Sequence, residues 1–379
     1  MNCSGIDVET GERIAVEFDQ TIRSIQVREE TPDIADDAIW IAPGFIDIQV
    51  NGFAGYDFND PEVTLGQVAT ALNMIVTTGV TRCLPTVITG SPHGMLACLT
   101  TLRRAQRELP NAKAIAGFHV EGPYIGAEDG PRGAHPLQWV RKPDLAEYHR
   151  WQEVTDHNVR LVTLSPHFEE APDFIRAVVA DGCAISIGHT GATAEQIQAA
   201  VDAGATLSTH LGNGAHKIML RHPNYLWEQL AEDRLSASFI VDGIHIGRAF
   251  LRTALRAKTV ERSVLVTDAS APAGTPPGHY KLGEQYADHL EDGRVVLAGT
   301  DKLAGSSLKM SQGIANLVHL GGLSLRDAVQ MSTVNPARIV NLEGRQDGLS
   351  VGERGDIVLF RFRDTVEIVA SYVDGRQLT

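Results

Sequence analysis

The spacing of hydrophobic positions divides the chain into two terminal parts and a long middle. Near both ends the apolar segments are short and bounded by turn residues, and the first two alternate apolar with polar positions, as half-buried β-strands do. These segments are Arg13–Phe18, Thr21–Val27, Ile39–Pro43, Gly355–Phe362 and Thr365–Val373. We therefore expect residues 1–42 and 350–379 to form one small β-sandwich domain built from both termini.

In the middle, apolar runs alternate with amphipathic stretches of helical spacing. The expected strands are Phe45–Val50, Thr81–Thr86, Ala114–Val120, Val159–Leu164, Cys183–Gly188, Ala205–His210, Leu235–Val241 and Ser263–Asp268. The expected helices between them include Leu65–Thr78, Gly94–Leu109, Ala171–Asp181, Thr193–Ala203 and Gly247–Lys258. Alternating strands and helices indicate βα units and a parallel sheet. Eight such units predict an α/β fold in which residues 43–349 form a (β/α)₈ TIM-type barrel.

The segments after the eighth strand add three further expectations. Helical patterns cover Ser307–Leu320 and Leu325–Val334, and Asn335-Pro336 is expected to break the second pattern. The segment Ala269–Tyr280 is rich in Pro and Gly, which suggests a mobile lid. A doubly wound open sheet is the alternative fold, but no convincing G-x-G-x-x-G follows the first strand.

Composition and charge limit the range of partners. The chain has 379 residues, 43% of them hydrophobic, which is enough for a large core. Its formal net charge is -14 and no Lys/Arg-rich run is present, so nucleic acid and anionic membranes are not expected partners. There is no apolar run of about 18 residues, and the N-terminus lacks the features of a secretory signal. The four scattered cysteines suggest free thiols in a reducing cytoplasm.

Candidate chemistry is found where the strands end. Glu121, His189, His210 and Asp268 each close an apolar segment, and a barrel carries its active site at the carboxyl ends of its strands. Two imidazoles and a carboxylate are typical ligands of a catalytic divalent metal with a position open to water. Asp268 is then placed to accept a proton from that water, although an aspartate there could equally cap a following helix.

Several of these motifs together resemble a known family. The stretches are Gly-Phe-Ile-Asp-Ile-Gln-Val-Asn-Gly from Gly44, Phe-His-Val-Glu-Gly-Pro from Phe118, Gly-His-Thr from Gly188, Thr-His-Leu from Thr209 and Val-Thr-Asp-Ala from Val266. They resemble the amidohydrolase superfamily and, more closely, the N-acetylglucosamine-6-phosphate deacetylases, over nearly the whole chain. The resemblance implies a metal-dependent hydrolase that converts N-acetylglucosamine 6-phosphate to glucosamine 6-phosphate and acetate.

The same resemblance implies roles for single residues. Glu121, His189 and His210 would hold the metal, most often zinc, with Fe²⁺, Mn²⁺ or Co²⁺ as other options. Asp268 would be the general base and then the general acid, and His135 would help to polarise the acetyl carbonyl. The residues implied to contact the sugar phosphate are Asn213, Gly214, Arg221 and His245. The resemblance also implies a homodimer.

Two departures from the superfamily pattern matter. Many members carry His-x-His on the first strand and bind two metals, whereas this chain has Asp47 and Gln49 there. An amide is a poor substitute for imidazole, so we expect one tightly held ion per chain with Gln49 as a neighbour of the metal site. After His210 the chain keeps Asn213 but lacks the bulky residues usual in the family, and the additional His216 is expected to be a surface or packing residue.

Two other functions remain open at this point. One is an amidohydrolase that acts on another N-acetylated amino sugar or N-acyl substrate, phosphorylated or not; Arg221 and His245 would then bind a carboxylate or pack. The other is a non-catalytic sugar-phosphate sensor on the same barrel. The presence of the metal-type residues together with Asp268 favours an enzyme over a sensor.

Overall fold

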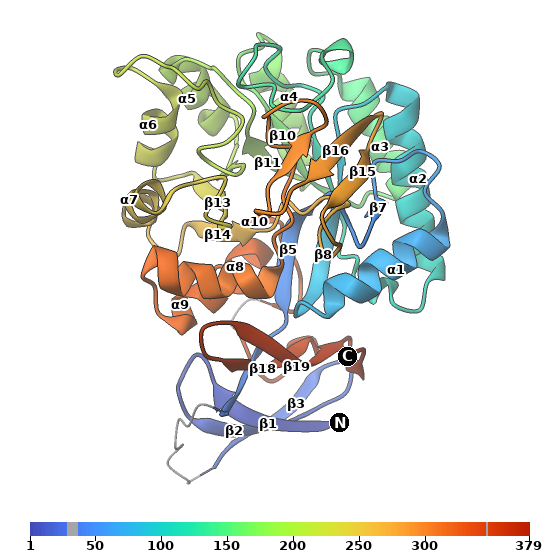
Figure 1. The fold of residues 1–379 in the computed structure, drawn as a ribbon, viewed down its shortest axis with the longest axis vertical. Helices are drawn as coiled ribbons and strands as arrows, with labels where there is room; N and C mark the ends of the chain where they lie inside the picture. Colours follow the sequence, from blue (N-terminus) through green and yellow to red (C-terminus); the bar gives the residue numbers. More distant parts are fainter. Residues whose placement is uncertain (29–36, 346–347) are drawn as a thin grey trace.

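The computed structural model describes residues 1–28, 37–345 and 348–379. It contains a barrel of parallel strands surrounded by helices and a smaller sheet at one end of the barrel (Figure 1). Both chain termini lie in the smaller sheet, at the bottom of the view in Figure 1.

The barrel has eight parallel strands in a single hydrogen-bonded order, β14-β13-β12-β11-β10-β9-β8-β5. They are β5 (Phe45–Val50), β8 (Val80–Ile88), β9 (Phe118–Glu121), β10 (Val159–Leu164), β11 (Ala184–Ile187), β12 (Leu207–Ser208), β13 (Ser236–Ile240) and β14 (Ser263–Val266). The first and last strands meet where Val50 pairs with Ala269 and the backbone N–H of Asp268 donates to the carbonyl of Gln49 at 2.9 Å. The predicted (β/α)₈ barrel is therefore confirmed.

Helices cover the outside of this barrel. They are α1 (Leu65–Val76), α2 (Pro92–Glu108), α3 (Leu145–Thr155), α4 (Ala171–Ala180), α5 (Ala194–Asp202), α6 (Tyr225–Ala231), α7 (Arg248–Lys258), α8 (Met310–Asn316), α9 (Leu325–Gln330) and α10 (Val334–Ile339). Helix α1 shows why they form: Thr64 and Gln67 make a capping box, and Val68, Leu72 and Ile75 form a buried stripe against the strands. None of the helices built from described residues is long and apolar enough to cross a membrane.

The smaller sheet combines strands from both termini, in the order β20-β19-β18-β4-β1-β2-β3. They are β1 (Asn2–Asp7), β2 (Arg13–Phe18), β3 (Ile22–Val27), β4 (Ile39–Pro43), β18 (Ile357–Phe362), β19 (Val366–Val373) and β20 (Arg376–Gln377). Strands β2 and β19 are not neighbours, yet the rings of Phe18 and Tyr372 pack with centroids 5.0 Å apart. One continuous sheet therefore folds over on itself to bury a common core, as the two layers of a sandwich do.

The amino ends of the barrel strands rest on this sheet. Arg82 on β8 forms a buried ion pair with Asp356, with Nε and Oδ2 2.9 Å apart, and the rings of Phe45 and Phe360 pack at 6.0 Å. A buried ion pair of this kind needs its partner in one place, so it favours a single orientation of sheet and barrel. The carboxyl ends of the strands are left free for chemistry.

Local structure differs from the sequence expectation in several places. The third strand, expected from Ala114, begins only at Phe118, and Ala114 belongs to a 3₁₀ turn over Ala112–Ala114. The helices α3 and α6 were not anticipated. Asn335-Pro336 does not break the helical pattern, because it lies in the first turn of α10. In the first turn of a helix the backbone N–H has no partner within the helix, so a proline can stand there without the loss of a hydrogen bond.

The Pro/Gly-rich segment after β14 is only partly a loop. Ala271 and Ala273 within it are fully buried, and the segment ends in β15 (Gly278–Leu282). That strand begins a three-stranded sheet with β16 (Gln285–His289) and β17 (Val295–Leu297), drawn in orange in Figure 1. Leu282 and residues 301–305 of this region line the barrel cavity described below.

Candidate active site

Three of the four residues expected to carry chemistry have an unusual backbone conformation. His189, His210 and Asp268 have φ angles of 51°, 30° and 47°, and they follow β11, β12 and β14. Residues other than glycine rarely adopt this left-handed region, because the Cβ atom crowds the backbone. Such strain persists where the surrounding structure enforces it, and it clusters at functional sites. Here it accompanies the turn of the chain at the strand ends.

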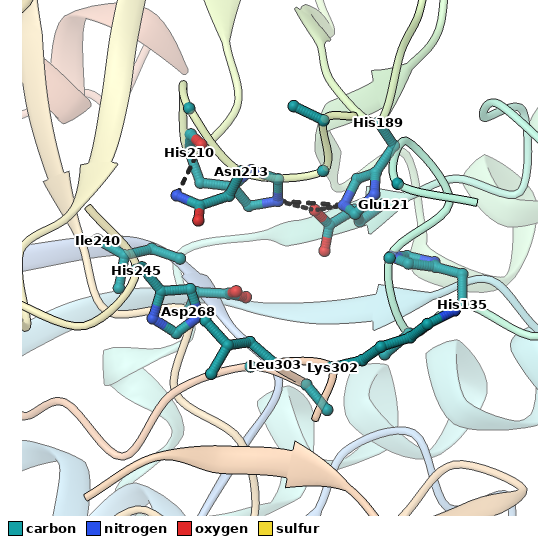
Figure 2. Close-up of a pocket in the computed structure, with 18 of the residues that line it drawn as sticks. Glu121, His135, His189, His210, Asn213, Ile240, His245, Asp268, Lys302 and Leu303 are labelled. Carbon is teal, nitrogen blue, oxygen red and sulfur yellow. Dashed lines mark hydrogen bonds and ion pairs between the residues drawn. The ribbon is translucent and has the colours of Figure 1, made fainter. Parts of the chain in front are cut away.

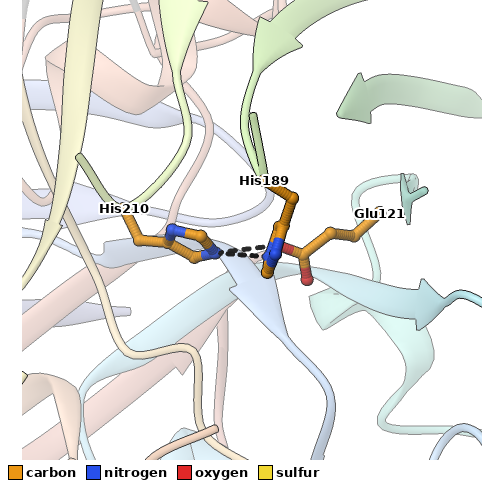
Figure 3. Close-up of side chains that lie close together, drawn as sticks. All are labelled: Glu121, His189 and His210. Atoms are coloured by element: carbon orange, nitrogen blue, oxygen red, sulfur yellow. Dashed lines mark hydrogen bonds and ion pairs between the residues drawn. The ribbon is translucent and has the colours of Figure 1, made fainter. Parts of the chain in front are cut away.

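Glu121, His189 and His210 bring their side-chain tips to one point (Figure 3). Oε1 of Glu121 lies 3.2 Å from Nε2 of His189 and 3.0 Å from Nε2 of His210, and the two imidazole nitrogens are 3.1 Å apart. All three residues are buried. Among the residues that the structure describes, they form the candidate group for a divalent metal that the sequence predicts.

The contacts around these three residues test whether they fit a metal. Nδ1 of His189 donates to the carbonyl of Pro131 at 2.7 Å, which leaves the lone pair of the ring on Nε2, facing Glu121. Burial alone would raise the pKa of Glu121, but contact with the rings of His189 and His210, in the state in which those rings carry the protons, holds the pKa of Glu121 well below its ordinary value. A carboxylate that stays ionised beside two inward-facing imidazole nitrogens suits a divalent cation.

Asp268 lies beside this group and is held by two amides. Nδ2 of Asn51 donates to Oδ1 of Asp268 at 2.6 Å, and Nε2 of Gln49 donates to the same oxygen at 3.2 Å. Burial, helped by the negative charge of Glu121, raises the pKa of Asp268 to about 6. The element after β14 is strand β15, with every residue between them described, so Asp268 has no helix to cap.

Gln49 on β5 and Asn51 immediately after this strand both reach the site. Nε2 of Gln49 also donates to Oε1 of Glu121 at 3.0 Å. Gln49 therefore neighbours the metal group, the name used here for Glu121, His189 and His210. Asp47, the other residue compared with His-x-His, is not part of the cavity wall, and its carboxylate accepts hydrogen bonds from Thr267. The side-chain alternation of a strand, with its period of two, could have pointed to Asn51.

The candidate residues lie around a cavity of about 590 Å³, and Figure 2 shows side chains that line it. Glu121, His189, His210 and Asp268 all line it, and so does His135 from the loop after β9. Nδ1 of His135 lies 2.8 Å from Oγ1 of Thr89, and burial lowers the pKa of this imidazole to about 3. His135, which the sequence alone would place in a loop without a role, is therefore buried inside the cavity wall.

Three of the four residues expected to contact a sugar phosphate also line the cavity, namely Asn213, Gly214 and His245. Nδ1 of His245 is anchored to Oδ2 of Asp242 at 2.6 Å. Gly214 has a φ of 55°, and a Cβ at this position would lie 2.8 Å from Nδ1 of His189. Only glycine lets the backbone approach the metal group so closely.

Arg221 is the exception among the expected substrate residues. It lies on the same long loop between β12 and α6 but is exposed, and it is not part of the cavity wall. Its assignment to the phosphate stays a prediction.

Two lysines in the cavity wall were not anticipated. Among the described residues, the Lys and Arg side chains that line the cavity are Lys217 and Lys302. Lys302 pairs with Asp129, and Nζ of Lys217 lies 3.4 Å from Oδ2 of Asp301, so both pairs span loops at the mouth. No sequence pattern marks such residues, because a single lysine in a loop is usually a solvated surface charge.

His216 also reaches the cavity wall, and it has packing contacts as well. It hydrogen-bonds to the hydroxyl of Tyr225 through Nδ1 and to Oε2 of Glu128 through Nε2, at 2.9 and 2.8 Å. The expectation of a packing role agrees with these contacts, but the position at the cavity was missed.

Known proteins resemble this chain over nearly its full length. N-acetylglucosamine-6-phosphate deacetylase of Danio rerio is 33% identical over 351 residues, covering 89% of this chain and 84% of that protein. N-acetylgalactosamine-6-phosphate deacetylase of Escherichia coli O157:H7 is 34% identical, covering 85% of this chain and 84% of that protein.

The comparison with solved structures agrees with the sequence comparison. N-acetyl-D-glucosamine-6-phosphate deacetylase of Mycobacterium smegmatis superimposes with a TM-score of 0.89 at 31% identity, covering 100% of both chains. A variant of that enzyme in complex with N-acetyl-D-glucosamine-6-phosphate gives the same TM-score of 0.89 at 30% identity, covering 100% of this chain and 99% of that one. The model of the amidohydrolase family matches residues 40–378, and the chain therefore belongs to the amidohydrolase family.

Proposed function

We propose that this protein hydrolyses the N-acetyl group of N-acetylglucosamine 6-phosphate to glucosamine 6-phosphate and acetate. The observation that carries the proposal is the buried carboxylate of Asp268 beside Glu121, His189 and His210 in one cavity. Similar proteins that are named as deacetylases of amino sugar 6-phosphates support the choice of substrate. The four cysteines are unpaired, which fits a cytoplasmic enzyme.

We assign the metal site to Glu121, His189 and His210, with one Zn²⁺ per chain as the proposed ion. A divalent cation bound there supplies Lewis-acid activation of water and of an acyl carbonyl. Gln49 supports a single ion, because its amide already donates to Glu121 and to Asp268 and so acts as a hydrogen-bond donor rather than as a ligand.

Asp268 and His135 would carry the proton transfers and the polarisation. Asp268 accepts a proton from the attacking water as its oxygen bonds to the acetyl carbon, and it later gives that proton to the amine nitrogen as the C–N bond breaks. A carboxylate with a pKa of about 6 can act as base at neutral pH and still hold a proton for the second step. His135 donates a hydrogen bond to the carbonyl oxygen, on which negative charge develops.

We propose that Asn213, Gly214 and His245 hold the sugar phosphate from the cavity wall, with Arg221 as a further contact. Arg221 can reach a phosphate only if its loop moves or if the loop enters the cavity of a second copy. Ile218 and Leu220 on that loop are 92% and 73% exposed, and exposed apolar residues of this kind are typical of an interface. They support the proposal of a homodimer.

A second candidate substrate is N-acetylgalactosamine 6-phosphate. It is favoured by the 34% identity to a deacetylase named for that sugar, which is as high as the identity to the glucosamine enzymes. The two sugars differ in the configuration of one hydroxyl, so their reaction at the amide would be the same.

The test is acetate release measured over a panel of substrates. The panel contains both N-acetylhexosamine 6-phosphates and both unphosphorylated sugars, each with and without a chelator. We expect the glucosamine 6-phosphate to give the highest kcat/KM and the chelator to abolish turnover. Preference for the galactosamine phosphate would select the second candidate, and binding without acetate release would indicate a sensor.

A further inference from the structure

Thr89, the residue that follows β8, lies directly behind His135. It is 3% exposed, and its Oγ1 is 2.8 Å from Nδ1 of His135. Gly122, the residue after Glu121, makes room for this hydroxyl, because a Cβ at Gly122 would come within 2.2 Å of Oγ1. The hydroxyl of Thr89 is therefore enclosed between the chain that carries Glu121 and the ring of His135.

The contact with Thr89 determines which nitrogen of the His135 ring can bind a ligand in the cavity. Nδ1 faces Thr89, so Nε2 is the nitrogen available to a ligand. A neutral imidazole carries a single N–H, and the hydrogen bond made by one nitrogen determines the state of the other. If Nδ1 carries the proton and donates to Thr89, Nε2 can only accept. If Thr89 donates to Nδ1, the N–H is on Nε2.

We propose that Thr89 is a positioning residue that donates its hydroxyl proton to Nδ1 of His135 and so keeps the N–H of this ring on Nε2, toward the cavity. The inference rests on the proposed function, in which His135 donates a hydrogen bond to the acetyl oxygen. Only the tautomer with the proton on Nε2 can do so from a neutral ring.

Other contacts hold the His135 backbone independently of Thr89. Its N–H donates to the carbonyl of Arg132 at 3.2 Å, and the Arg132 guanidinium donates to its carbonyl at 3.0 Å. Its ring also packs edge to face on His189, with centroids 4.4 Å apart. Loss of the Thr89 hydroxyl should therefore leave the loop in place and change only the protonation pattern and orientation of the ring.

The variants for the test are Thr89→Val, which keeps the shape but lacks the hydroxyl, and Thr89→Ser, which keeps the donor. Thr155→Val is a matched control, because Thr155 is also fully buried but its hydroxyl bonds to the carbonyl of Trp151 in α3. His135→Gln identifies the signals of His135 and supplies the background for a double-mutant cycle.

The primary readout is the ¹⁵N NMR spectrum of histidine-labelled, metal-loaded protein, in which protonated and unprotonated ring nitrogens have distinct shifts. We expect His135 of the wild type and of Thr89→Ser to carry the proton on Nε2, and this state to be lost in Thr89→Val. A wild-type ring with its proton on Nδ1 would overturn the proposal. Because this spectrum does not require turnover, it decides the proposal even if the protein does not act on the proposed substrate.

The second readout is kinetic. We expect Thr89→Val to lower kcat for the N-acetylated sugar phosphate by about ten- to a hundredfold, the scale for loss of an orienting contact, with KM and metal content unchanged. Thr89→Ser and Thr155→Val should stay near wild type. In the His135→Gln background, Thr89→Val should not lower kcat any further. If it lowers kcat there by the same factor as in the wild type, Thr89 acts through another residue.

Discussion

Asn51 and Asp268 are joined by a hydrogen bond of 2.6 Å from the amide Nδ2 to the carboxylate Oδ1. Asn51 follows the first strand of the barrel and Asp268 follows the last, so the bond lies where the barrel closes. The closure of the fold thus aligns the proposed base with Glu121, because Gln49 donates to both carboxylates.

This hydrogen bond leads to a prediction about pH. The base must be ionised to accept a proton, so kcat/KM should fall as the pH drops through the pKa of Asp268, which is about 6. Asn51 stabilises the ionised form, and its loss in Asn51→Ala should move the acid limb of the profile to higher pH. The measurement is the pH profile of kcat/KM for both proteins. An acid limb that stays in place would show that another group controls it.

Asp268→Asn tests the base directly. The amide cannot accept the water proton, whereas Glu121, His189 and His210 are unchanged. We expect kcat to fall by at least about a hundredfold, the scale of general-base loss, with the metal content retained. Steady-state kinetics and metal analysis on the same preparation provide the check. Turnover close to wild type in the metal-loaded variant would assign the base to another residue.

The number of metal ions is a separate prediction. With the amide of Gln49 in place of an imidazole ligand, we expect about one tightly bound divalent ion per chain. Glu121→Gln should lose that ion, because the neutral amide is a weaker ligand than a carboxylate. Elemental analysis after exhaustive dialysis gives the number of ions per chain in the wild type and in Glu121→Gln. Two ions that resist dialysis would contradict the mononuclear site.

Arg221→Ala tests the contact with the phosphate. A charge-assisted hydrogen bond contributes roughly 1.5–3 kcal/mol, so the variant should lose about ten- to a hundredfold in kcat/KM for the 6-phosphate. The unphosphorylated sugar should be almost unaffected. Lys302→Ala serves as the matched comparison, because Lys302 lies in the cavity wall whereas Arg221 is outside it. Equal losses on both sugars for Arg221→Ala would remove the phosphate assignment.

The sequence predicted the parts of the site that follow from strand order. Glu121, His189 and His210 end strands of a parallel barrel, and the carboxyl ends of such strands must meet at one face. Asn51 was missed because the expected strand ended at Val50 and only Asp47 and Gln49 were compared with the known motif. The part of the cavity wall that the loops after β9 and β12 form could not be predicted, because the conformation of a loop depends on packing rather than on periodicity. Lys302, on the loop after β17, and the contact of Thr89 with His135 were missed for the same reason.

The most direct test of the account is acetate release from N-acetylglucosamine 6-phosphate by the protein as purified, after removal of metal by a chelator, and after addition of one equivalent of Zn²⁺. The account predicts turnover in the first sample, none in the second, and recovery in the third, with Asp268→Asn inactive in all three. Acetate release that persists at full rate in the metal-free protein, or a metal-loaded wild type that releases none, would contradict it.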